Sequence, residues 1–112
     1  MPDNERLCAL AQAGDTAARE LLLENNLGFI RKTALEVHGK AGESGLDVDD
    51  LVQEGCIGLL SAIDRFDAVR GMKFLTYAAP AIRNAMTDCV RAALSQFEWR
   101  LEGDGLQRVY LD

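Results

Sequence analysis

The sequence of 112 residues has few of the features that mark disulfide-linked, metal-binding or membrane proteins. Its three cysteines are widely spaced, and no CxxC pair or cluster of histidines accompanies them. We therefore interpret the cysteines as small buried hydrophobic residues and expect no metal site. No apolar run reaches the roughly eighteen residues of a membrane-spanning helix. The amino terminus, MPDNERLC, lacks the basic and apolar regions of a signal peptide, which predicts a cytoplasmic protein without a membrane partner.

Residues for acid–base or nucleophilic catalysis are scarce as well. The single histidine, His38, lies at an expected helix end and has no nucleophile near it in the sequence. An exposed residue at a helix end is the simpler interpretation. We expect neither enzyme activity nor a bound cofactor.

Basic charge is also in short supply, because the formal net charge is −6. Proteins that bind duplex DNA usually carry a basic surplus. Residues 1–63 carry eleven acids and five bases, residues 64–94 three acids and five bases, and residues 95–112 four acids and two bases. The basic excess is thus confined to the middle segment. An acidic domain of this kind should need a partner to supply affinity for DNA.

Apolar residues recur at steps of three and four through most of the chain, which predicts helices. A first helix is expected over residues 4–13, with Asp3 as its amino-terminal cap. A second helical segment begins after Asp15 and ends at His38–Gly39. A break or bend is expected within it near residues 25–28, where two asparagines and a glycine disfavour helix.

Two further helices are expected beyond an exposed loop at residues 40–46. The first begins with a capping signature at Asp47 and continues to about Arg65. The last runs roughly over residues 74–94 and contains Pro80, which should kink it or force a short 3₁₀ start.

The pattern as a whole predicts an all-α fold. No strand is strongly predicted, because the periodicity beyond residue 95 is weak and includes the turn-forming Gly103–Asp104–Gly105. We expect a compact bundle of about four to five helices over residues 1–94. Residues 95–112 are interpreted as a carboxy-terminal extension or the start of a linker to further domains.

Two glycines, Gly55 and Gly58, lie inside the expected helix 47–65, where each costs about 1 kcal/mol relative to alanine. The close approach of another helix would offset this cost. Acidic and amide side chains recur on related turns of the same helix. Spacing alone favours tight packing within the domain and an ordinary solvated acidic face over a surface that binds a partner.

Residues 66–77 combine aromatic rings, cations and a hydroxyl group within twelve positions. Rings stack on bases, at about 1–3 kcal/mol per base, and cations follow the phosphates of single-stranded nucleic acid. A base removed from a duplex also needs a pocket that replaces its stacking. The alternative is that Phe66 and Phe74 are core residues and the cations are solvated. That alternative stays open for Phe66 and is weaker for the cluster as a whole.

A long segment resembles region 2 of bacterial RNA polymerase sigma factors. It runs from Asp50 to Arg91, DLVQEGCIGLLSAIDRFDAVRGMKFLTYAAPAIRNAMTDCVR, within a looser resemblance over roughly residues 4–94. The resemblance implies a domain of the same helical fold that binds core RNA polymerase and recognises and melts the minus-ten promoter element. It also leaves an anti-sigma factor as a further partner.

The resemblance implies that the helix over residues 47–65 binds the coiled coil of the polymerase β′ clamp. Carboxylate and amide groups there can pair with arginines of the clamp, and a leucine supplies an apolar anchor. Cys56 departs from the usual asparagine of the family. The implied polymerase-binding residues are Asp50, Gln53, Glu54, Cys56 and Leu60.

The resemblance further implies that Tyr77 stacks on a flipped adenine of the nontemplate strand. Arg70, Phe74 and Thr76 would shape the pocket around this base, and Lys73 would contact the backbone. Downstream, Arg83 and its neighbours would lie near the duplex edge upstream of the bubble. Asn26 would help to read the downstream part of the same element. The implied DNA-binding residues are Asn26, Phe66, Arg70, Lys73, Phe74, Thr76, Tyr77, Arg83, Asn84 and Thr87.

The sequence departs from primary sigma factors at several positions. Pro80–Ala81 replace a tryptophan pair, Met72 replaces an aromatic residue, and Asp88 replaces a common basic residue. The Pro80–Ala81 change is typical of an alternative sigma factor with altered promoter preference and weaker intrinsic melting. Met72 would weaken one wall of the base pocket, and Asp88 would lower the affinity for the DNA backbone. The absent tryptophans and the acidic balance also support a second hypothesis, a sigma-mimic module that binds polymerase without reading DNA.

Overall fold

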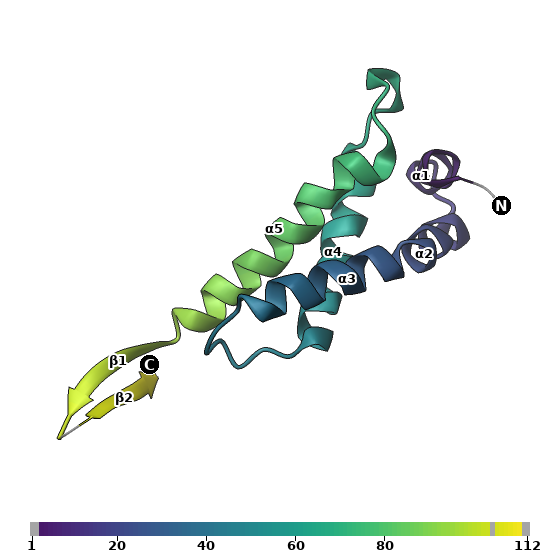
Figure 1. Cartoon of the computed structure of the whole chain (residues 1–112). Coiled ribbons are helices and arrows are strands. Elements are labelled where there is room, and N and C mark those ends of the chain that lie inside the picture. Colours follow the sequence, from purple (N-terminus) through teal and green to yellow (C-terminus); the bar gives the residue numbers. More distant parts are fainter. Residues whose placement is uncertain (1–2, 104, 111–112) are drawn as a thin grey trace.

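The computed structural model describes residues 3–103 and 105–110 and has a helical bundle as its main part (Figure 1). Within these residues there are five α-helices and one short 3₁₀ helix, which confirms the predicted all-α class and the number of helices in the bundle. No described helix is long and apolar enough to cross a membrane. The helices are α1 (Asn4–Gln12), α2 (Thr16–Asn25), α3 (Leu27–Gly39), α4 (Val48–Arg65), the 3₁₀ helix η1 (Ala68–Arg70) and α5 (Phe74–Leu94).

The helices begin where the sequence places capping residues. The Asp3 carboxylate accepts a hydrogen bond from the Arg6 amide at 2.8 Å, and Asp15 caps α2 in the same way. At the start of α4, Asp47 and Asp50 form a capping box in which each side chain accepts from the backbone amide of the other. The predicted starts of these helices are therefore confirmed.

The predicted break in the second helical segment falls at Asn26, between α2 and α3. Asn26 is buried, and its amide nitrogen donates to the Leu22 carbonyl oxygen at 2.7 Å and to the Asn4 side-chain oxygen at 3.0 Å. The side chain thus satisfies a helix-end carbonyl and ties the junction to α1. The break has a structural purpose in addition to its low helix propensity.

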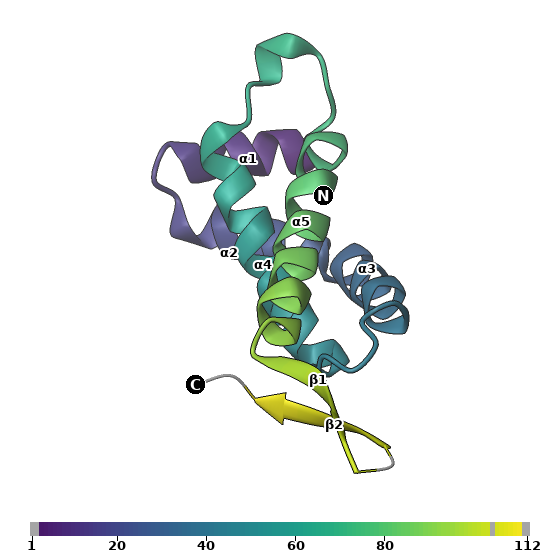
Figure 2. The same cartoon turned by 90° about the vertical axis from the view of Figure 1, so that its left-hand side faces the viewer.

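The two longest helices, α4 and α5, pack along each other and form the centre of the bundle (Figures 1 and 2). A Cβ atom added at Gly58 would lie 2.7 Å from the Ala81 backbone oxygen of α5. A Cβ added at Gly55 would collide with the side chains of Met86 and Ile30. The glycines of α4 are therefore explained by the close approach of neighbouring helices within the domain, as spacing alone favoured.

The expected 3₁₀ start at Pro80 is wrong. The α-helix α5 begins at Phe74 and continues through Pro80, and the 3₁₀ helix lies before it, at Ala68–Arg70. Proline lacks an N–H group, so the carbonyl oxygen of Thr76 receives no hydrogen bond from the residue four positions later. Thr76 is exposed and is the third residue of α5, so the missing hydrogen bond falls in the first turn of the helix.

Beyond α5 the chain forms a β-hairpin that was not predicted. Strand β1 (Phe97–Glu102) pairs antiparallel with β2 (Gly105–Tyr110), with Phe97 opposite Tyr110 and Glu102 opposite Gly105. The hairpin projects from the end of α5, away from the helices (Figure 1). Its signal was present, since FEWRLE alternates apolar and polar residues before a glycine-containing turn, but it was outweighed by the helical pattern of the rest.

The three cysteines differ in their surroundings. Cys8 is buried, as expected, and burial raises the pKa of its thiol to about 11, so the thiol stays protonated. Cys56 and Cys89 are only half-buried, because they lie towards the outer sides of α4 and α5. Burial was therefore predicted correctly for one thiol and overestimated for two.

Candidate nucleic-acid and polymerase interfaces

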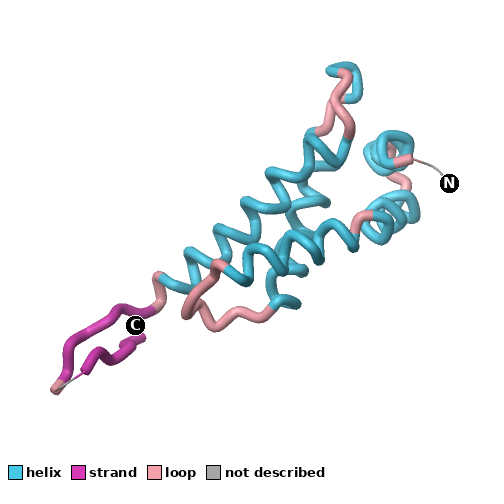
Figure 3. Tube along the Cα trace, in the orientation of Figure 1, coloured by secondary structure: helices cyan, strands magenta, loops and turns pink. Residues whose placement is uncertain are grey.

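The segment between α4 and α5 extends beyond the end of the bundle (Figure 3). With the adjoining ends of the two helices it encloses a pocket of about 450 Å³, which lies within the range of small-ligand sites. We call this the Tyr77 pocket. Its lining residues are Arg65, Phe66, Asp67, Arg70, Met72 and Tyr77.

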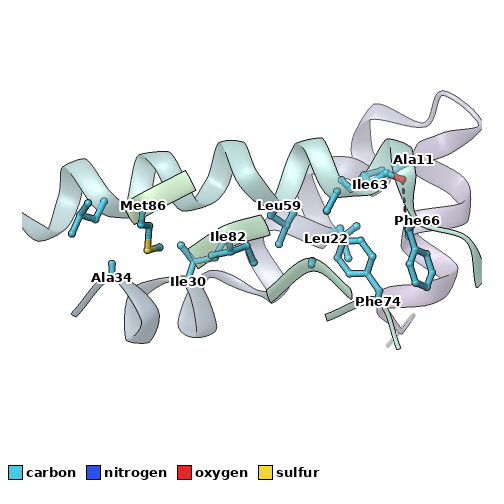
Figure 4. Packing of buried hydrophobic residues seen from close by; sticks show 14 of the residues in the cluster. Ala11, Leu22, Ile30, Ala34, Leu59, Ile63, Phe66, Phe74, Ile82 and Met86 are labelled. Atoms are coloured by element: carbon cyan, nitrogen blue, oxygen red, sulfur yellow. Dashed lines mark hydrogen bonds between the residues drawn. The ribbon is translucent and has the colours of Figure 1, made fainter. Parts of the chain in front are cut away.

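Three aromatic rings form one side of the Tyr77 pocket and the core beneath it. The Phe66 ring lies 5.7 Å from the Tyr77 ring and 5.4 Å from the Phe74 ring, centroid to centroid, and meets Phe74 edge to face. Phe74 is fully buried and Phe66 nearly so, whereas Tyr77 is half-buried (Figure 4 shows the two phenylalanines). Tyr77 therefore presents a ring to the pocket, and the other two rings support it from below.

This placement changes the expected part of two residues. Phe74 lies in the core and does not line the Tyr77 pocket, so it can shape the pocket only through Phe66. Thr76, which was expected in the same pocket, instead lines a separate hollow on α5. Phe66 could be either a core residue or part of a nucleic-acid site, and the structure places it in both the core and the pocket lining. The residue is only 7 % exposed and still lines the Tyr77 pocket.

Helix α1 fixes the two ends of the segment that forms the pocket. The Gln12 side-chain amide donates to the carbonyl oxygens of Ile63 at 2.7 Å and Phe66 at 2.8 Å, which closes the carboxy-terminal end of α4. The Glu5 carboxylate accepts from the Phe74 amide at 3.3 Å, at the start of α5. Figure 2 shows α1 lying beside these two helix ends. Sequence analysis missed Gln12 and Glu5, because their partners are more than fifty residues away.

The cations around the Tyr77 pocket differ in whether they form an ion pair with a carboxylate of the chain. Arg70 lies 3.8 Å from Asp67, and Lys73 lies 3.5 Å from Glu5. Both cations remain more than four-fifths exposed. Arg65 also lines the pocket and forms no ion pair with any residue that the structure describes. Arg65 is a further cation that sequence analysis did not single out, although its position next to Phe66 made it visible.

A second hollow, of about 480 Å³, lies between α3 and α5. Three residues that the resemblance assigns to DNA meet there, Thr76, Arg83 and Asn84, together with Pro80. The Thr87 hydroxyl, one turn further along α5, donates to the Asn84 carbonyl oxygen at 3.2 Å. The complete lining is Phe29, Thr33, Thr76, Ala79, Pro80, Arg83 and Asn84, and we call it the α3–α5 hollow.

Asn26 does not join either site. It is 96 % buried, and its side-chain nitrogen and oxygen are both occupied by hydrogen bonds to Asn4 and Leu22. In this conformation the side chain has no free group for a base. The residue lies in the predicted α2–α3 junction. Its contact with DNA stays a prediction, and that contact would require these hydrogen bonds to be exchanged.

The residues assigned to polymerase binding line one side of α4. Gln53 is exposed, and Asp50, Glu54, Cys56 and Leu60 are half-buried. Among them lies Ile57, with 59 % of its surface exposed, which sequence analysis did not name. Helical spacing could have found it, because it is four residues after Gln53 and three before Leu60. We call these six residues the outer face of α4.

The acidic side chains of this face also influence α5. Burial, and then the negative charges of Glu54 and Asp50, raise the pKa of the Cys89 thiol. Burial alone raises the pKa of Cys56. Both thiols are therefore neutral near pH 7, and Cys56 offers an apolar atom where the resembling family has an amide. The face thus combines carboxylates, an amide and apolar groups on one side of a single helix.

Comparison with known protein families matches residues 22–95 to Sigma-70 region 2. A putative RNA polymerase sigma-G factor of Bacillus thuringiensis subsp. kurstaki is 45 % identical over 71 residues, which cover 63 % of this chain and 54 % of that protein. The sigma-G factor of Bacillus subtilis (strain 168) is 45 % identical over 73 residues, 65 % of this chain and 26 % of the other. The sigma-C factor of Myxococcus xanthus is 36 % identical over 89 residues, which cover 80 % of this chain and 29 % of that protein. The chain thus spans between about a quarter and about half of the length of these relatives.

Proposed function

Because the chain belongs to the Sigma-70 region 2 family of RNA polymerase sigma factors, we propose that it docks on core polymerase and captures an unpaired base of the minus-ten promoter element. Sigma factors initiate transcription and are not enzymes, so the work of this domain is binding. The single observation that supports base capture best is the Tyr77 pocket, in which an accessible ring lies beside two arginines.

The physical basis of the proposal is differential binding. A flipped base loses its stacking in the duplex, and a pocket with an aromatic side can return about 1–3 kcal/mol of that loss. Arg65 and Arg70 at the pocket supply positive charge for the adjoining phosphates. Preference for the open strand over the closed duplex then shifts the melting equilibrium towards the bubble.

We propose that the outer face of α4 binds the helical coiled coil of the polymerase β′ clamp. The carboxylates of Asp50 and Glu54 suit arginines on a partner, and Ile57 and Leu60 provide apolar contacts. Docking at this face supplies affinity that a chain of net charge −6 lacks towards DNA on its own.

The proposal is tested with core polymerase and a labelled nontemplate oligonucleotide that carries a minus-ten element. Tyr77→Ala should reduce capture of the oligonucleotide at least about fivefold, as the loss of about 1–3 kcal/mol from one stacked base predicts, and leave polymerase binding unchanged. Tyr77→Phe keeps the ring and serves as the matched control, with capture close to that of the unchanged chain. Full capture by Tyr77→Ala would overturn the proposal for this pocket.

The second candidate is the sigma mimic, which binds polymerase without reading DNA. Two observations favour it: the acidic net charge, and Pro80–Ala81 in place of a tryptophan pair. The same experiment separates the two functions. The mimic would be supported if the unchanged chain and Tyr77→Phe both bind polymerase but neither increases capture of the oligonucleotide.

A further inference from the structure

The three cations assigned to DNA have one property in common that their proposed role does not explain. Each of them lies within ion-pair distance of a carboxylate of the same chain. These carboxylates come from three separate parts of the sequence, so no single acidic segment accounts for them. The pairs are Arg70 with Asp67 at 3.8 Å, Lys73 with Glu5 at 3.5 Å, and Arg83 with Glu36 at 2.6 Å.

The pair between Arg83 and Glu36 is the most tightly held of the three. Its nitrogen–oxygen distance is that of a charge-assisted hydrogen bond, and it joins α5 to α3 across 47 positions of sequence. Arg83 is 45 % exposed, about half the exposure of Arg70 and Lys73. Arg83 also lines the α3–α5 hollow, so Glu36 holds it at the edge of a surface whose residues the family resemblance assigns to DNA.

Glu36 keeps cationic neighbours even without Arg83. Lys32 and Lys40 lie one helical turn before and after it in the sequence, at the spacing that brings side chains together on a helix. The hydrogen bond from Arg83 lowers the pKa of Glu36 most, and the positive charges of Arg83, Lys32 and Lys40 lower it further. The carboxylate is therefore ionised at neutral pH and would not be left without counter-charge if Arg83 moved to another anion.

We propose that Glu36 is an internal competitor for the DNA backbone, which occupies Arg83 in the free chain and releases it to a phosphate when promoter DNA lies along α5. This inference rests on the proposed function. Glu36 then lowers the affinity of the free chain for any DNA, while a chain tethered to polymerase meets DNA at a local concentration high enough to displace the carboxylate. Glu36 thereby favours DNA held at the polymerase over the bulk of the genome.

The test uses the full chain bound to core polymerase and a fork-junction DNA, which has an upstream duplex and a single-stranded nontemplate minus-ten element. Glu36→Gln removes the charge and keeps the size of the side chain. It should tighten binding about two- to fivefold, the range that one exposed ion pair can supply. Glu20→Gln is the matched control, because Glu20 is exposed on α2 and forms no ion pair with any described residue. It changes the net charge equally and should alter binding much less.

A second arm places the same substitutions in an Arg83→Ala background. Loss of one duplex phosphate contact should reduce the slope of log affinity against log salt concentration by about 0.9. In this background Glu36→Gln should increase the affinity for fork-junction DNA no more than Glu20→Gln does. An equal effect of the two glutamine variants in the original chain, or a gain by Glu36→Gln that survives the loss of Arg83, would overturn the inference.

The failure of this inference is distinguishable from failure of the proposed function. If Tyr77→Ala abolishes capture of the fork DNA and Glu36→Gln changes nothing beyond its control, the competitor is wrong and base capture stands. If none of the variants nor the original chain captures the fork DNA on polymerase, both proposals fall.

Discussion

The outer face of α4 and the Tyr77 pocket are constructed differently. All residues of the outer face belong to one helix, and their relative positions follow from helical geometry. The pocket combines the end of α4, the η1 turn and the first turn of α5. It depends on two residues of α1, Gln12, which donates hydrogen bonds to the end of α4, and Glu5, which accepts one from the start of α5. The first surface should tolerate changes elsewhere in the chain, whereas the second should respond to changes far from Tyr77.

The largest effect is expected from a substitution at the contact between α4 and α5, because this contact supports both surfaces and its loss should weaken both. Gly58→Ala places a Cβ atom against the Ala81 backbone and should lower the free energy of unfolding by about 1–3 kcal/mol. Gly28→Ala is the control, since its added Cβ has no neighbour within 4 Å, and it should raise the free energy of unfolding by up to about 1 kcal/mol. Denaturant unfolding of the two variants checks this, and a stable Gly58→Ala would mean that α4 and α5 can separate without cost.

A smaller effect should separate the surfaces. Gln12→Leu leaves the carbonyl oxygens of Ile63 and Phe66 without their donor and should lower the free energy of unfolding by about 1–2 kcal/mol. Oligonucleotide capture on polymerase should weaken, while polymerase binding stays the same. Gln53→Leu is the counterpart on the outer face of α4, with weaker polymerase binding and unchanged stability. Equal loss of polymerase binding in both variants would contradict the independence of the two surfaces.

Two exposed apolar residues of similar accessibility allow a test of whether the outer face of α4 is the polymerase interface. Ile57 and Leu35 are 59 % and 56 % exposed, on α4 and α3 respectively. Ile57→Ala should weaken polymerase binding by about 1 kcal/mol, or about fivefold, whereas Leu35→Ala should leave it unchanged. Titration of labelled polymerase with each variant measures the difference. A stronger effect from Leu35 would move the interface to α3.

The smallest effect concerns the Arg83–Glu36 pair and depends on pH. The fold lowers the pKa of Glu36 below its ordinary value of 4.5, so the stabilisation by this pair is fully present above that value and is lost as pH falls through the lowered pKa. The melting temperature of Glu36→Gln should lie slightly below that of the original chain near neutral pH and converge with it in acid. A constant difference at all pH values would show that the charge of Glu36 is not its cause.

What could be predicted from the sequence follows the same division. The capping box at Asp47, the break at Asn26 and the close packing of Gly58 follow from neighbouring residues, and the structure has them. The bonds of Gln12 and the pairing of Glu36 join residues 47 to 54 positions apart, and no local pattern indicates them. Tyr77 was found because a family resemblance marked it, and its accessibility could be established only from coordinates.

The uninterrupted length of α5 sets the distance between Tyr77 and the β-hairpin. Tyr77 lies near its first turn and the β-hairpin follows its last, so about eighteen residues at about 1.5 Å each hold the two roughly 27 Å apart (Figure 1). Along one DNA strand that span equals about eight nucleotide steps of about 3.4 Å. If Tyr77 seats a nucleotide as proposed, a group that contacts the hairpin would lie about eight such steps away from it.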